Sequence, residues 1–337
     1  NAKLTITKSD LQATKRISTQ NLEAYNLIQK AYKHISNPIY SPPIISEKIE
    51  PLVQTAIKLD STYGEAYAIA SLAKSYKWMY VSTENDSVKQ QQEIRDINIA
   101  ELLAKTALQH DEDNILALAI LVYLPLWQIN NDVSEENKII IIRTMLLDAQ
   151  KLIRKYPDDL FSQYVYAYIL VFRSMIIGGD KEDYQEPLNM MLAIFEKLNN
   201  NNFKVSHPTE GIIFSFIFKH IPEIYFMMGE GHKGMDFIKN NKDTLCKNGT
   251  YECLNAEILA EIGNGFYNSY EYEEALEILN IVIARSKQEL EAVGSTEGSK
   301  QLPYFRAGMI NMKFGNYNKA LENYNLAIKY IDMYDIT

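Results

Sequence analysis

Residues that turn a chain sharply are scarce in this sequence of 337 residues, which contains only 14 glycines and 10 prolines. That small share does not fit an all-β protein, whose many short strands are joined by glycine- and proline-rich turns. Disorder is excluded as the main state, because 47% of the residues are hydrophobic and 23% are charged. The length fits two ordinary domains or one elongated repeat array, and the scarcity of turn residues favours an array of helices.

Positive charge is also in short supply. The 34 lysines and arginines are outnumbered by 43 aspartates and glutamates, which gives a formal net charge of -9. Binding to nucleic acid needs a basic surface that neutralises phosphates. We therefore expect no nucleic-acid partner for this segment.

Long apolar runs are missing too. A membrane-crossing helix needs about 18 to 20 consecutive apolar residues, and the richest stretch, 115–127, is interrupted by Pro125. The chain opens with Asn1 and Ala2, without a methionine or a secretory segment, so we interpret these two residues as the remnant of a tag and residues 1–18 as a linker or helix. A membrane anchor is expected only outside this segment.

Cysteine occurs only twice, as Cys246 and Cys253. One interpretation is a pair of unbonded thiols. The other is a disulfide, because a turn at Asn248 and Gly249 brings the two sulfurs toward bonding distance, and such a bond persists in an oxidising compartment. A zinc site needs four ligands, and no further Cys or His pair at metal spacing lies nearby in the sequence. We expect no metal.

What the sequence does contain is a pattern of small and aromatic residues near its C-terminal end. It predicts two helices around a break at Gly315, in which small residues let the helix backbones approach while aromatic rings fill the gaps. The residues of this pattern are Tyr304, Ala307, Gly308, Ala320, Tyr324 and Ala327. Their order resembles the tetratricopeptide repeat, a helical hairpin of about 34 residues. Asn311 stands where that family usually has an aromatic residue.

A second copy of the pattern precedes the first. It contains Gly263, Phe266 and Ala275 around a break at 268–270, and a glycine- and serine-rich loop at 294–300 lengthens the spacing to the next copy. The resemblance to the tetratricopeptide repeat is as close as in the first copy. These two copies make 246–337 the more regular part of the chain.

The pattern is looser upstream but it continues. Helices that end near Asp60, Asp111 and Pro157 resemble the second helices of tetratricopeptide repeats. We count about six hairpins plus an N-terminal helix, which is enough for the continuous core of a repeat array. The resemblance implies an all-α fold, a right-handed α-α superhelix of helical hairpins, with divergent hairpins over 19–245.

Residues 18–25, together with Leu4 and Thr5, resemble the junction that opens the repeat region of bacterial multidomain signalling proteins. These are the ToxR/CadC-type membrane-anchored transcriptional regulators and the class III adenylate cyclases that carry a C-terminal repeat domain. Ser18 stands where those families have proline. The resemblance implies the sensory or interaction part of a signalling or regulatory protein. Together with the cysteine pair it favours a periplasmic location, with a cytoplasmic one as the alternative.

A catalytic constellation is not apparent. The five histidines are scattered, and the sequence contains no nucleophile elbow, Walker loop or His-Glu-x-x-His signature. We therefore expect a non-catalytic protein without a cofactor, which binds a protein or peptide partner, or else a small-molecule ligand. The alternatives are a cytoplasmic scaffold for the assembly of protein complexes and an enzyme on a helical scaffold.

Tyrosine is abundant, with 23 residues against 12 phenylalanines and 2 tryptophans. In a helical array the first helices line the inner wall, where tyrosines one turn apart offer amphipathic contact area. Two interpretations stay open for such residues, which are packing between repeats and contact with a ligand on the concave face. The candidates for the concave face are Tyr164, Tyr168, Tyr76 and Trp78.

Overall fold

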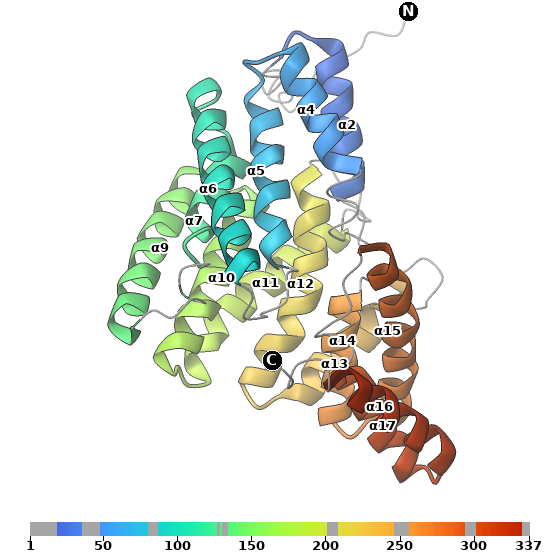
Figure 1. The fold of residues 1–337 in the computed structure, drawn as a ribbon. Coiled ribbons are helices and arrows are strands. Elements are labelled where there is room, and N and C mark those ends of the chain that lie inside the picture. Colours follow the sequence, from blue (N-terminus) through green and yellow to red (C-terminus); the bar gives the residue numbers. More distant parts are fainter. Residues whose placement is uncertain are drawn as a thin grey trace, which may run out of the picture.

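The computed structural model of the chain describes residues 19–35, 48–79, 87–126, 129, 134–200, 208–245, 256–293 and 301–331. Throughout these ranges the protein is all-α, without a strand, and successive helices pack in pairs (Figure 1). The first helices of the pairs are α2 (Leu22–Ile35), α5 (Gly64–Met79), α7 (Ile115–Tyr123), α10 (Leu160–Ile177), α12 (Pro208–Met227), α14 (Ala256–Asn268) and α16 (Gln301–Lys313). The second helices are α4 (Glu50–Leu59), α6 (Ser87–His110), α9 (Glu135–Lys155), α11 (Gln185–Asn200), α13 (Gly231–Leu245), α15 (Tyr272–Val293) and α17 (Tyr317–Ile331).

The pairing differs from the sequence-based count at the N-terminal end. The helix α2 does not stand alone but packs against α4. The described residues therefore form seven pairs. A short 3-10 helix, η2 (Glu182–Tyr184), leads into α11.

The turn between the two helices of a pair has the same form in four pairs. Its central residue has a left-handed backbone, with φ of 68° at Gly178, 72° at Gly229, 64° at Tyr270 and 74° at Gly315. The next N–H group donates to a carbonyl five residues back, which satisfies the end of the first helix. These bonds run from Gly179 to Ser174, from Glu230 to Tyr225, from Glu271 to Phe266 and from Asn316 to Asn311. One backbone arrangement thus closes four helical hairpins.

A second kind of turn joins one pair to the next at three places. At each turn, the N–H group of one residue donates to the carbonyl four residues before it. The carbonyl of that same residue accepts from the N–H group three residues after it. The residues that make these turns are Asp60 with Tyr63, Asp111 with Asn114, and Tyr156 with Asp159. Asn114 and Asp159 also cap α7 and α10, because their side chains accept a first-turn N–H. These turns lie where the sequence predicts that second helices end.

The small and aromatic residues of the two C-terminal pairs lie between helices. The buried members of the set are Gly263, Phe266, Ala275, Tyr304, Ala307, Gly308, Ala320 and Ala327, and Tyr324 is partly buried. A Cβ atom at Gly308 would lie 2.7 Å from Cε1 of Tyr324, and one at Gly263 would lie 3.1 Å from Cδ2 of Leu279. A larger side chain at either glycine therefore requires a neighbouring side chain to move.

The first helices also contact one another, and in the first five pairs these contacts close a ring. Contacts join α2 to α5, α5 to α7, α7 to α10 and α10 to α12, and α12 in turn contacts α2. Figure 1 shows α12, in yellow, reaching the blue helix α2 from a distant part of the chain. We call α2, α5, α7, α10 and α12 the ring. The pairs α14–α15 and α16–α17, which continue from α12 and α13, form the arm at the lower right of Figure 1.

Candidate functional site

Aromatic side chains gather where α10 meets α12 in the ring. Tyr164, Tyr168 and Phe172 are spaced four residues apart on α10, which places them on one face of that helix. Phe216 and His220 have the same spacing on α12. Contact between the two helices brings both sets together.

His220 lies at the centre of this cluster. Its Nδ1 atom and the hydroxyl oxygen of Tyr164 are 3.1 Å apart in a hydrogen bond. Its ring centroid lies 4.7 Å from that of Tyr168 and 6.1 Å from that of Phe216. On the other side of the His220 imidazole, Nε2 is 3.8 Å from a carboxylate oxygen of Glu223. His220 is 8% exposed and Tyr164 is 6% exposed, so the cluster holds its polar atoms inside the protein.

A second hydroxyl contact lies further along the ring. The hydroxyl oxygens of Ser75 on α5 and Tyr123 on α7 are 2.8 Å apart. Burial raises the pKa of Tyr123 and the pKa of Tyr164 above the ordinary range of a phenol. Both tyrosines therefore stay neutral, and their hydroxyl groups join neighbouring helices of the ring by hydrogen bonds.

The structure places the four aromatic candidates for a concave face in different ways. Tyr164 is buried and Tyr168 is partly buried, both in the cluster around His220. Tyr76 and Trp78 belong to α5, but their side chains lie outside the described residues. Contact of any of them with a ligand stays a prediction. The cysteine pair, Cys246 and Cys253, also lies outside the described residues.

The helix α10 is long and apolar enough to cross a membrane, judged by length and composition within the described residues. Half of it is buried inside the protein. It contacts α7, α9, α11 and α12, and these contacts account for its apolar character as a core helix.

The arm carries exposed apolar side chains that the sequence analysis did not single out. Leu302, Phe305, Met309 and Met312 on α16 are 44%, 46%, 38% and 48% exposed. Their spacing of three, four and three residues puts them on one face of the helix. We call these four residues the apolar stripe. The spacing alone was a signal that could have revealed it, but the same spacing also describes a buried helix face.

The surroundings of the apolar stripe come from the preceding pair. The hydroxyl of Tyr267 on α14 donates to the sulfur of Met309 at 3.3 Å, so the stripe borders α14. Lys313 follows the stripe at the end of α16. Its Nζ atom donates to the hydroxyl of Tyr272 at 2.9 Å and lies 4.0 Å from the centroid of that ring. The stripe therefore ends at an exposed positive charge.

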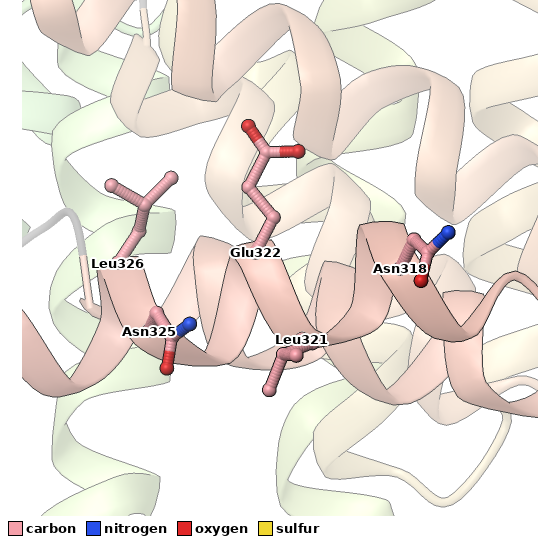
Figure 2. A pocket seen from close by; sticks show the side chains of 5 residues that line it. All are labelled: Asn318, Leu321, Glu322, Asn325 and Leu326. Carbon is pink, nitrogen blue, oxygen red and sulfur yellow. The ribbon is translucent and has the colours of Figure 1, made fainter.

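A small ligand or an ion would need a pocket or a group of ligating side chains in the described part of the chain. Among these residues no group of three or more His, Cys, Asp or Glu side chains is placed to hold a metal ion. A hollow of about 400 Å³ lies on α17, lined by Asn318, Leu321, Glu322, Asn325 and Leu326. Figure 2 shows that all five side chains come from this one helix. A hollow lined from a single helix does not enclose a ligand, unlike a typical small-molecule site.

Comparison with known proteins gives no family: no protein-family model matches the sequence, and no curated protein is significantly similar to it.

Proposed function

We propose that this chain is a non-catalytic binding protein, built as a right-handed superhelix of tetratricopeptide-like hairpins, which binds a protein or peptide partner through the arm. The fold part of this proposal is supported by the two recurring turns, one within pairs and one between pairs. A repeat array places the same backbone arrangement at the same point of successive units.

The contrast between the ring and the arm carries the binding part of the proposal. In the ring, polar and aromatic side chains such as Tyr164 and His220 bond to each other and are buried. In the arm, the apolar stripe on α16 is exposed along the helix. Exposed apolar side chains also occur elsewhere, as at Leu22 and Met175 of the ring, but a row of four along one helix face forms a contiguous apolar surface of the kind that marks an interaction site. The partner's contact is therefore assigned to the arm.

The biological setting that we propose is the sensory or interaction part of a bacterial signalling or transcriptional regulatory protein. Its support is the resemblance of residues 18–25 to the junction in such proteins. The periplasmic location rests on that resemblance and on the pair Cys246 and Cys253. A count of free thiols on denatured protein prepared without reductant tests the location, because two reactive thiols favour the cytoplasm.

Selection of peptides from an unbiased display library on the full chain tests the binding function. Selected peptides should lose about tenfold or more in affinity with Phe305→Glu, which puts a charge into the apolar stripe. Leu147→Glu is the matched control, because Leu147 is an exposed apolar residue on the second helix α9. It should leave the affinity unchanged. Failure of the wild-type chain to select any peptide, or binders that respond only to Leu147→Glu, would contradict the proposal.

A further inference from the structure

We infer that the apolar stripe is a docking surface for an amphipathic helix that carries an acidic residue at one end. This inference rests on the proposed binding function and names the chemistry of the partner. We propose that the helix bound at the stripe belongs to another protein. A second copy of this chain and an extended peptide strand are the rival occupants that the test separates.

The shape of the stripe fits a helix lying along α16. Leu302 and Met312 are separated by about three helical turns, a length of about 15 Å at 1.5 Å per residue. A straight row of this kind presents ridges that interlock with the side chains of a second helix. In the part of the chain that the structure describes, helices cover the buried faces of other helices, as α16 itself is covered by α15 and α17. Two methionines in the row add side chains that adapt to a partner's surface.

Charge supplies the second element of the inference. Within the described residues Lys313 meets the hydroxyl and ring of Tyr272, and no carboxylate pairs with it. Other lysines that join neighbouring helices do pair with acids, as Lys239 of α13 pairs with Glu271. A carboxylate on the partner would complement Lys313 at the end of the stripe.

The net charge limits how acidic the partner is. The whole chain carries a formal charge of -9, so a strongly acidic partner would be repelled at a distance. Attraction at Lys313 combined with this repulsion favours a mainly apolar helix with its acid confined to one end.

Three pools of displayed peptides, selected on the full chain, test the inference. The first pool has a helical apolar pattern with a glutamate at one end, the second has the same helix with lysine in that place, and the third has an alternating strand pattern with the glutamate. Affinities of the selected peptides are measured by fluorescence anisotropy against the wild-type chain and four variants. Met309→Glu and Lys313→Glu alter the proposed surface, whereas Leu321→Glu on α17 and Leu147→Glu on α9 alter exposed apolar positions elsewhere.

The first pool should supply the binders. Met309→Glu should weaken them about tenfold or more, and both control variants should leave them within about twofold. Lys313→Glu should weaken the glutamate peptides and strengthen their lysine counterparts, a reversal that a purely structural role of Lys313 would not produce. Circular dichroism of each variant checks that the fold is retained.

Other results overturn the inference. Dominance of the second or third pool would show a different partner chemistry, as would affinities that do not respond to Lys313→Glu. Self-association of the chain that Met309→Glu abolishes would assign the stripe to a second copy. Binders found only in the unbiased library would refute the helix and leave the binding function standing, whereas no binder in any library would refute both.

Discussion

Four hairpin turns have a central residue with a left-handed backbone, and this residue is glycine in three of them and Tyr270 in the fourth. A left-handed backbone costs a residue with a Cβ atom about 1 to 2 kcal/mol, and glycine avoids this cost. Glycine loses more conformational entropy on folding than other residues, which offsets part of the stabilisation. Tyr270 is 77% exposed, so little packing is lost on its removal. Tyr270→Gly should therefore raise the free energy of unfolding in urea by about 0.5 to 1 kcal/mol. Tyr317→Gly, at an exposed helical position, should lower it, and a loss of stability in both variants would contradict the prediction.

Glu65 on α5 titrates near neutrality because of its surroundings. Burial raises its pKa to about 7, although a hydrogen bond from Nδ2 of Asn114 opposes the shift and Asp111 adds to it. The folded pKa lies above the unfolded one, so Glu65 contributes stability below the unfolded pKa that is lost as pH rises through about 7.

Glu65→Gln should remove the loss of folding stability that accompanies the ionisation of Glu65. At about pH 8 the variant should be more stable than wild type by on the order of 1 to 3 kcal/mol, whereas at about pH 5 most of the difference should vanish. Urea unfolding at the two pH values gives both numbers. An equal difference in stability between variant and wild type at both pH values would show that Glu65 is not the titrating group.

At the scale of elements, the packing of α16 on α17 depends on small residues. Ala320 is fully buried, and a leucine there would overpack the pair at a cost of about 1 to 3 kcal/mol. Ala320→Leu should lower the midpoint of thermal unfolding, while Asn318→Leu, at an exposed position of the same helix, should change it little. If Ala320→Leu melts like wild type while Leu326→Ala is severe, the assignment of helix faces is wrong.

The sequence predicted the elements well where local chemistry decides them. Gly315 marks the turn of the last pair because a left-handed backbone favours glycine, and the second helices predicted to end near Asp60, Asp111 and Pro157 do end at the turns between pairs. It did not predict that His220 is a partner of Tyr164, because the two residues are far apart in the chain and no local pattern links them. Nor did the sequence distinguish the apolar stripe from a buried helix face, since apolar residues three and four positions apart are typical of both.

At the scale of the whole molecule, the sequence predicted an array but not its closure. Contacts between neighbouring pairs follow from the order of hairpins along the chain. The contact of α2 with α12 does not, because it joins the first pair to the fifth. In an open array each unit is stabilised only by its neighbours, whereas in the ring the first pair also supports the fifth.

This difference predicts how a local defect spreads. Ile28 on α2 is fully buried, and Ile28→Ala should cost about 2 to 5 kcal/mol. Because α2 contacts α4, α5 and α12, amide hydrogen exchange should rise in all three helices and stay unchanged in α9 of the third pair, which has no such contact. Ile278→Ala on α15 of the arm is the matched control, since Ile278 is also fully buried, and its effect should reach α14 and α16 before any helix of the ring. Exchange after Ile28→Ala that decays steadily along the sequence, reaching α9 before α12, would mean that the ring is open in solution.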